Sequence, residues 1–379
     1  MRDFALEVYF SRWEFKAKHH MTASDAESLS MADLLSMATP EHRAAFDDCW
    51  LGYTETWGAP DLRAAVAGTY DGLDAENILC FAGAEEGIYA AMRVLLTPDD
   101  HVIVAVPNYQ AAETLPLNIC EVTGVPLRDD MDWRLDLDAL AAAIRPNTKL
   151  VSINFPNNPT GAVMPRADFD ALIAICREHD LYLFSDEVYR LLEVDETKRL
   201  PQAADAYEKG ISLNVMSKAY GLPGLRIGWL ASQDTELLAR LEHYKHYLSI
   251  CNSAPSERLA VIALAARDRI LERNRALVRD NLAALDGFFA DYPGLFDWSH
   301  PDGGCVAYPR FLGRGGVEAF CHDLVEESGV LLLPASIYRS ELMDTVPDRF
   351  RIGFGRRNIE DGIAEMRRFL ERRHNDFAV

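Results

Sequence analysis

Short apolar runs alternate with amphipathic runs between residues 78 and 231, and this alternation restricts the fold more than any other feature of the sequence. Residues 78–81, 101–106 and 150–154 are apolar and strand-like. The run after residue 84 has helical spacing, with Ile88, Ala91, Met92 and Leu95 on one face. Repeated strand–helix units predict an α/β fold with a mostly parallel sheet, helices on its faces and right-handed crossovers.

The length of the chain predicts two domains. Its 379 residues exceed the ~250–300 at which a single core stops growing. We expect a large domain at 40–265, and a smaller α+β domain formed by an N-terminal arm at 1–39 together with 266–379. A helical stretch from 256 to 290 joins them, and short strands at 305–308 and 330–333 alternate with helices near 317–327 and 359–371 in the smaller domain.

Charge and cysteine usage exclude several classes of protein. A formal net charge of −21 disfavours nucleic-acid phosphates and anionic membranes as partners. No apolar run is long enough to cross a bilayer. The seven cysteines are scattered, without a CxxC pair or metal-ligand spacing, so we expect free thiols, no metal site and a cytoplasmic location.

Three polar turns follow predicted strands, where open α/β sheets place their ligands. One is an Asn-Asn-Pro-Thr-Gly turn that contains Asn158. Another begins with Asp186, whose carboxylate at the end of a buried strand needs a cationic or donor partner to stay ionised. The third places Lys218 before a Gly/Pro-rich turn that ends at Arg226. A fourth turn, at Gly83, opens a helix and offers free N–H groups to an anion.

These segments, in this order, resemble the class I and II aminotransferases, which are pyridoxal-phosphate (PLP) enzymes of fold type I, of the aspartate aminotransferase type. The resemblance covers the chain from Tyr53 to Arg351. It implies that Lys218 holds PLP as an imine, that Asp186 pairs with the pyridine nitrogen, and that Tyr109 stacks on the ring. Lys218, Asp186 and Tyr189 are then the catalytic residues. The other residues implied to bind the cofactor are Gly83, Ala84, Glu85, Asn158, Tyr189, Ser217 and Arg226.

The resemblance also implies further contacts to phosphate, substrate and partner. Arg351, with Asn158, would bind the substrate carboxylate, and Tyr53 would reach the phosphate of the partner subunit in a homodimer. We expect the Glu85 carboxylate to turn away from the phosphate while its backbone binds. One position departs from the family pattern: Val215 stands where many members have a phosphate-binding Ser or Thr, so we expect somewhat weaker PLP retention.

The implied reaction is a ping-pong transfer of the amino group from an L-amino acid to a 2-oxo acid. One alternative is a PLP-dependent lyase, oxidase or cyclase that acts on an arginine-derived or other amino acid. The segment Trp13-Glu14-Phe15 is faintly similar to the arm of the arginine-modifying branch, which includes capreomycidine synthase-like enzymes; there, Glu14 would meet a guanidinium. A remote alternative is a non-catalytic PLP-binding regulator, but no DNA-binding domain is evident. A nicotinamide dehydrogenase is disfavoured because no GxGxxG motif opens a helix.

Overall fold

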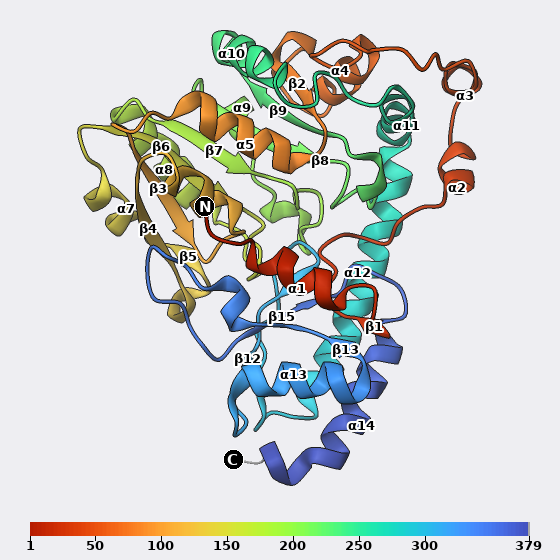
Figure 1. Cartoon of the computed structure of the whole chain (residues 1–379), viewed down its shortest axis with the longest axis vertical. Coiled ribbons are helices and arrows are strands. Elements are labelled where there is room, and N and C mark those ends of the chain that lie inside the picture. The colour runs from red at the N-terminus through yellow and green to blue at the C-terminus, as the bar shows by residue number, and fades with distance from the viewer. Residues whose placement is uncertain (378–379) are drawn as a thin grey trace.

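The computed structural model describes residues 1–377, without the side chains of 374 and 375, and is built around an eight-stranded sheet. The strands of this sheet are β2 (Ile78–Phe81), β3 (His101–Val106), β4 (Glu121–Arg128), β5 (Arg134–Leu135), β6 (Thr148–Asn154), β7 (Tyr182–Asp186), β8 (Gly210–Val215) and β9 (Gly228–Ser232). Their order is β2-β9-β8-β7-β6-β3-β4-β5 (Figure 1). Neighbours from β4 to β8 are parallel, whereas β9 and β5 are antiparallel to their neighbours. The predicted, mostly parallel sheet is confirmed.

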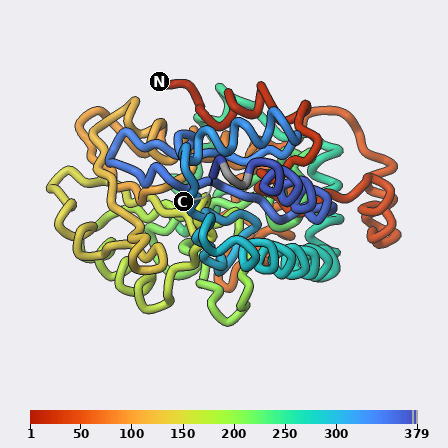
Figure 2. The backbone as a smooth tube through the Cα atoms, turned by 90° about the horizontal axis from the view of Figure 1, so that it is seen from below, coloured from red at the N-terminus to blue at the C-terminus, as the bar shows by residue number. Residues whose placement is uncertain are grey.

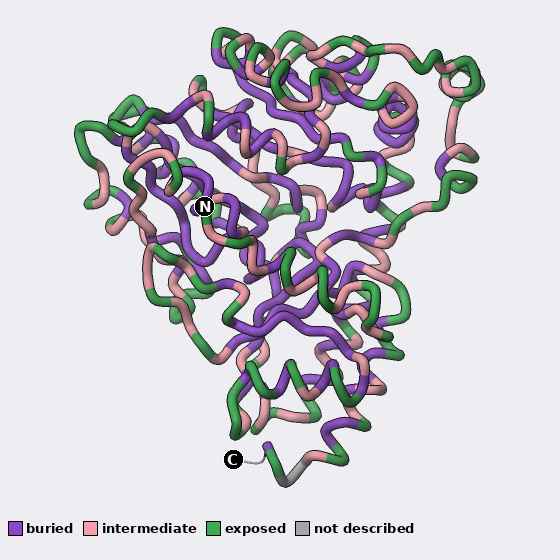
Figure 3. The backbone as a smooth tube through the Cα atoms, in the orientation of Figure 1, coloured by how far each residue is buried: buried purple, intermediate pink, exposed green. Residues whose placement is uncertain are grey.

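Both faces of the sheet are buried, which explains the uninterrupted apolar runs. Along β3, Val102 and Val104 belong to one core cluster, whereas Ile103 and Ala105 belong to another. The first cluster includes α5 (Ala84–Leu95) and α6 (Ala111–Leu117), and the second includes α7 (Leu137–Ala143) and α8 (Arg166–Glu178). In Figure 3 the strands form a continuous buried layer between these helices. Three more helices border the sheet: α4 (Pro60–Ala67), α9 (Ala203–Ala206) and α10 (Thr235–Lys245).

A smaller domain with antiparallel strands lies below the large sheet (Figures 1 and 2). Its three-stranded sheet has the order β11-β15-β14. Its elements are β10 (Phe296–Asp297), β11 (Val306–Ala307), β12 (Arg310–Phe311), α13 (Gly316–Ser328), β13 (Val330–Leu331), β14 (Leu333–Pro334), β15 (Phe350–Gly353) and α14 (Ile359–Phe377). The domain boundaries at 40 and 266 remain a prediction.

The helical stretch predicted at 256–290 consists of two helices, α11 (Ala254–Ala265) and α12 (Arg267–Ala290). The break falls at Ala266, where no Gly or Pro marks it in the sequence. In Figure 1, α12 runs from the side of the large sheet down into the smaller domain. It therefore connects the two parts of the chain as one continuous helix of 24 residues.

The N-terminal arm lies across the front of the molecule in Figure 1. It contains α1 (Ala5–Trp13), β1 (His19–His20) and α2 (Met31–Leu35), and α3 (Pro40–Asp47) follows it. β1 pairs in parallel with β13, which ties the arm to the smaller domain. The N-cap of α2 is Ser30, whose Oγ accepts a hydrogen bond from Asp33 N at 3.1 Å.

All seven cysteines are free thiols. Within residues 1–377, no helix combines the length and apolar character needed to cross a membrane.

Candidate active site

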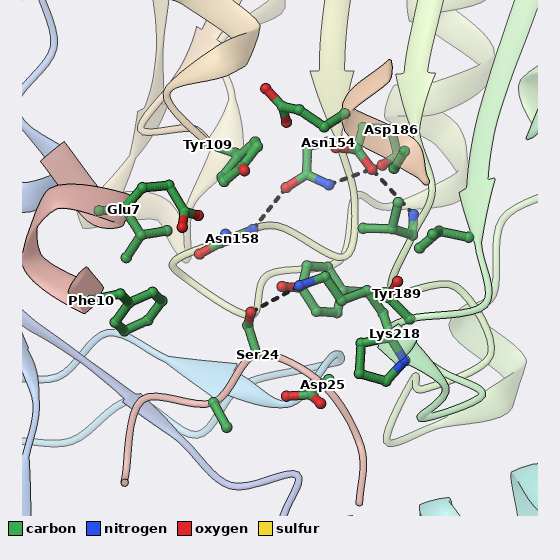
Figure 4. Close-up of a pocket in the computed structure, with 18 of the residues that line it drawn as sticks. Glu7, Phe10, Ser24, Asp25, Tyr109, Asn154, Asn158, Asp186, Tyr189 and Lys218 are labelled. Carbon is green, nitrogen blue, oxygen red and sulfur yellow. Dashed lines mark hydrogen bonds between the residues drawn. The ribbon is translucent and has the colours of Figure 1, made fainter. Parts of the chain in front are cut away.

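A cavity of about 420 Å³ opens where β6, β7 and β8 end, between the N-terminus of α5, helix α1 and residues 23–25 (Figure 4). Predicted site residues that line it are Ala84, Glu85, Tyr109, Asn158, Asp186, Tyr189, Ser217, Lys218 and Arg226. Three others, Gly83, Arg351 and Tyr53, do not line it. The structure therefore brings most of the predicted residues together from segments far apart in the sequence.

Lys218 lies just beyond the end of β8 and directs its amine into the cavity. Its Nζ donates to Ser24 Oγ at 2.9 Å and lies 5.7 Å from the centre of the Tyr189 ring. Burial lowers the pKa of Lys218, an effect that the carboxylate of Asp25 partly opposes. A lowered pKa increases the share of the neutral amine, which is the form that can act as a nucleophile.

Asp186 ends β7 and lies opposite Asn154, the last residue of β6. Its Oδ1 accepts from Val188 N at 3.2 Å, and its backbone oxygen accepts from Asn154 Nδ2 at 2.9 Å. Asn154 Oδ1 in turn accepts from Asn158 N at 2.8 Å (Figure 4). Burial raises the pKa of Asp186 to about 6, although the nearby Lys218 amine works against this. Among the described residues, the carboxylate therefore lacks a strong cationic partner.

The side chain of Asn158 is oriented by two donors behind the cavity. Its Oδ1 accepts from Arg351 Nη1 at 3.0 Å and from Tyr338 Oη at 3.2 Å. Because the amide oxygen is occupied, the amide nitrogen is the atom that can donate into the cavity. Arg351 itself is wholly buried, and its Nη2 donates to Thr22 O at 2.7 Å. Its Nε has no hydrogen-bond partner among the described residues.

The end of the cavity at α5 is suited to an anion. Gly83 caps α5 with a φ of +97°, and the first N–H groups of the helix follow it. The Arg226 guanidinium lies directly against Gly83, in the space that a Cβ would need. Ser217 lines the same cavity, and so does Val215, the apolar residue at the unusual position. Helix dipole and guanidinium together favour a phosphate here.

Carboxylates also line the cavity. Glu7 and Glu14 come from α1 and the residue after it, and Glu85 comes from the first turn of α5. Burial raises the pKa of Glu85 to about 7, and burial together with the charge of Glu7 raises the pKa of Glu14. In the described part of the chain, neither Glu7 nor Glu85 belongs to an ion pair. Asp25 differs, because Arg356 Nη2 contacts both of its oxygens at 2.9 and 3.0 Å.

That the Glu85 carboxylate turns away from the phosphate stays a prediction, but the residue does line the cavity. The side chain faces the cavity beside Tyr109, whose hydroxyl is a hydrogen-bond partner of the carboxylate. The reason is local: in the first turn of α5 it is Glu86, the next residue, that turns back and accepts from Ala82 N at 2.6 Å. Glu85 is therefore left to face the cavity.

Tyr53 lies outside the cavity and is 85% exposed. Its loop also exposes Trp50 and Leu51, and it is joined to the loop before α11 by Thr54 Oγ1, which donates to Asn252 O at 3.2 Å. The predicted contact of Tyr53 with a partner's cofactor stays a prediction.

Several cavity residues had not been predicted as site residues: Phe10, Ser24, Asp25, Asn154 and Arg356. Asn154 carried a usable signal, since it ends a strand next to the Asn-Asn-Pro-Thr-Gly turn. The others come from the arm or from beyond β15, and only tertiary packing brings them to the site.

Comparison with known proteins decides the family. The family model for aminotransferase class I and II matches residues 30–364, which covers most of the chain. The chain belongs to the class I and II aminotransferases.

Relatives of this family member include a synthase and a transaminase. Capreomycidine synthase of Streptomyces vinaceus is 30% identical over 95% of this chain and 91% of its own. Arginine–pyruvate transaminase AruH of Pseudomonas aeruginosa is 32% identical over 84% of this chain and 86% of its own. Among solved structures, a PLP-dependent aminotransferase from Streptococcus suis matches with a TM-score of 0.91 and 32% identity over 98% of both chains.

Aminotransferases of this family depend on PLP, and the residues present fit this cofactor. The Asp186 carboxylate suits a protonated ring nitrogen, Asn158 Nδ2 suits a phenolic oxygen, and Lys218 can bond the aldehyde. Arg226 and the α5 N-terminus suit the phosphate. The elevated pKa of Asp186 is itself an indication, because a buried carboxylate without a strong cationic partner would be satisfied by a bound cation.

Proposed function

We propose that this aminotransferase-family enzyme moves the amino group of an L-amino acid to a 2-oxo acid, in two half-reactions on one site. The observation that carries the proposal is the position of Lys218, whose buried amine has a lowered pKa and faces a cavity shared with Asp186. PLP, when bound, supplies the electron sink and carries the amino group between the two half-reactions. The rest of the chemistry falls to residues of the chain.

Lys218 has two tasks in this proposal. Its Nζ would hold the cofactor, and the amine, once free, would move a proton to and from the substrate Cα. A lowered pKa serves the second task, since a general base works best when its pKa is near the operating pH. Ser24, which accepts from Nζ at 2.9 Å, orients the amine.

Asp186, Asn158 and Tyr189 control the charge on the ring. Ionised Asp186 stabilises a protonated ring nitrogen, and this keeps the ring electron-poor. Asn158 Nδ2 and the Tyr189 hydroxyl donate to the phenolic oxygen. Arg351 would bind the substrate carboxylate, because its Nε is unpartnered in the described structure and it already contacts Asn158. Planar guanidinium groups suit carboxylates.

We further propose that the preferred amino donor carries a positively charged side chain. Glu7, Glu14 and Glu85 line the cavity, and two of these three carboxylates have no ion-pair partner in the described chain. The similarity to an arginine–pyruvate transaminase supports this donor class. Such carboxylates would repel an acidic donor such as aspartate.

The test is spectroscopic. The visible band of the purified holoenzyme is followed while arginine, lysine, alanine and aspartate are added one at a time, and a 2-oxo acid is then added to restore the band. We expect the fastest change with arginine or lysine, and regeneration by pyruvate. Borohydride should label Lys218. A protein without a visible band, or with Lys218 unlabelled, contradicts the proposal. To test the donor class, Glu14→Gln should weaken the binding of arginine more than the binding of alanine. Glu360→Gln, at an exposed position, serves as the control.

A second candidate is a cyclase or related PLP enzyme that acts on an arginine-derived amino acid. The similarity to capreomycidine synthase over 95% of the chain favours it. The same carboxylates would bind the guanidinium. The two candidates differ in their need for a 2-oxo acid: turnover of hydroxyarginine without one would favour the cyclase, whereas dependence on pyruvate would favour the aminotransferase.

The enzyme is also proposed to be a homodimer in which Tyr53 completes the partner's site. Support comes from the exposed side chains Trp50, Leu51, Tyr53 and Tyr247 on two loops that hydrogen-bond to each other. Exposed apolar groups of this size are typical of interfaces. Sedimentation of wild type and of Tyr53→Phe should give a dimer for both, with weaker PLP retention in the variant.

A further inference from the structure

Glu113 carries a buried carboxylate outside the cavity that no step of the reaction uses. It lies on α6, is 1% exposed, and receives four donors from three separate segments. Asn108 Nδ2 donates to it at 3.3 Å, Ser340 Oγ at 2.7 Å and Glu341 N at 3.1 Å. The fourth donor is Arg2 Nη2, which forms an ion pair with it at 2.5 Å. A buried carboxylate with this many donors fixes the segments that supply them.

Arg2 has further contacts that hold the beginning of the arm. Its Nη1 donates to Arg339 O at 3.0 Å and its Nε to Thr114 Oγ1 at 3.2 Å. Next to it, Gln110 makes two hydrogen bonds with the arm, accepting from Ala5 N and donating to Asp3 O, both at 2.9 Å. The segment before α1 is therefore attached to the large domain by side chains of one short stretch, 110–114.

Each segment that meets at Glu113 leads directly to the active site. The arm continues into α1, which carries Glu7 and Phe10 into the cavity. Asn108 precedes Tyr109, a cavity residue whose ring lies 5.1 Å from that of Phe4. Ser340 lies two residues after Tyr338, which hydrogen-bonds to Asn158. One carboxylate thus connects α1 with Tyr109, which lines the cavity, and with the segment of Tyr338, which lies behind Asn158.

We propose that Glu113 and Arg2 are positioning residues that hold α1 over the substrate end of the cavity. Neither touches the cavity or the predicted cofactor contacts. Loss of the ion pair should therefore weaken binding of the amino donor, because Glu7 and Phe10 lose their fixed position. It should leave the cofactor in place, because Lys218, Asp186 and Arg226 are attached elsewhere. A purely structural ion pair would lower stability without separating these two effects.

The test compares Arg2→Met with Arg12→Met in the holoenzyme. Arg12 is the matched control: it lies on the same arm, and its exposed ion pair with Glu326 at 3.6 Å is remote from Glu113. For Arg2→Met we expect KM of the amino donor to rise roughly tenfold, the effect of about one charge-assisted hydrogen bond, with kcat within about twofold. The visible cofactor band should not change. Hydrogen exchange of residues 5–13 should become faster in Arg2→Met only.

Two results would overturn the inference: an unchanged KM and exchange rate in Arg2→Met, or equal effects in Arg12→Met. Glu113→Gln provides a second variant, which keeps the size of the side chain and removes its charge; it should reproduce the KM effect. The turnover readout rests on the proposed function. If wild type turned over no amino acid, the proposed function would fail, whereas the exchange measurement would still test the attachment of α1.

Discussion

Replacing Asp186 with Asn should raise the stability of the apoprotein but lower the stability of the protein with PLP bound. Asp186 ends β7 in a buried position, and burial raises the pKa of its carboxyl group from 3.8 to about 6. Above pH 6 the apoprotein therefore holds an ionised carboxylate whose desolvation is only partly offset by Val188 N and the Lys218 amine. Asparagine has nearly the same shape and no charge, so it avoids this cost.

The size of the effect follows from the pKa shift. A difference of about two pKa units, at 1.36 kcal/mol each, corresponds to about 3 kcal/mol. Between pH 4 and 6 the folded apoprotein binds more protons at Asp186 than the unfolded chain does, so its stability falls as pH rises through this range and stays lower above it. At pH 7.5, apo Asp186→Asn should be more stable than wild type by up to about 3 kcal/mol. At pH 4 the difference should nearly vanish.

Urea denaturation of both apoproteins at pH 4, 5, 6 and 7.5 measures this difference. Asp170→Asn serves as control, because its carboxylate is 54% exposed on α8 and should give no pH-dependent gain. With PLP bound, wild type should be the more stable protein, because a protonated ring nitrogen would give Asp186 a cationic partner. We expect the variant to retain PLP roughly 10–100-fold more weakly, which is the effect of losing one hydrogen bond to a charged group. An apo variant that is less stable at pH 7.5, or whose advantage does not depend on pH, would refute the reasoning.

Three other variants test separate parts of the site. Val215→Ser adds a hydroxyl at the phosphate end and should lower the PLP dissociation constant by ~tenfold in an absorbance titration; unchanged or weaker retention would contradict this. Arg351→Lys removes the planar guanidinium that can donate to Asn158 and to a substrate carboxylate together, so it should raise KM of the amino donor roughly 10–100-fold. A change below about threefold would count against the assignment. Glu85 has a pKa of about 7, so KM for a cationic donor should fall as pH rises through about 7, and Glu85→Gln should flatten that profile; an identical profile in the variant would exclude Glu85 as a substrate contact.

The sheet and the residues at its carboxyl edge could be predicted because both depend on which residues follow each strand along the chain. Asn158, Asp186 and Lys218 each follow an apolar strand, and parallel strands bring their carboxyl ends to one edge. The sheet is mostly parallel, so these residues meet as predicted.

The position of α1 over the cavity could not be predicted in this way. The residues Leu6, Tyr9, Phe10 and Trp13 recur at helical spacing, but this pattern does not give the position of α1, which depends on contacts of the arm with residues about 110 and 320 positions away. Ser24 and Asp25 reach the site for the same reason. The family resemblance pointed to Arg351, but it did not indicate that this side chain would be wholly buried behind Asn158.

The contact between Gly83 and Arg226 means that the position of this positive charge depends on the absence of a side chain at residue 83. Any Cβ at position 83 would overlap the guanidinium, and the φ of +97° would add backbone strain. Such a substitution would leave every charged residue of the site in the sequence and yet displace Arg226 from the N-terminus of α5, where we propose that it binds the phosphate. A variant of this kind would conserve all the residues usually taken to mark a PLP enzyme and still fail to keep the cofactor. An inventory of charged motif residues is therefore insufficient evidence that a related sequence binds PLP, and position 83 should be inspected first.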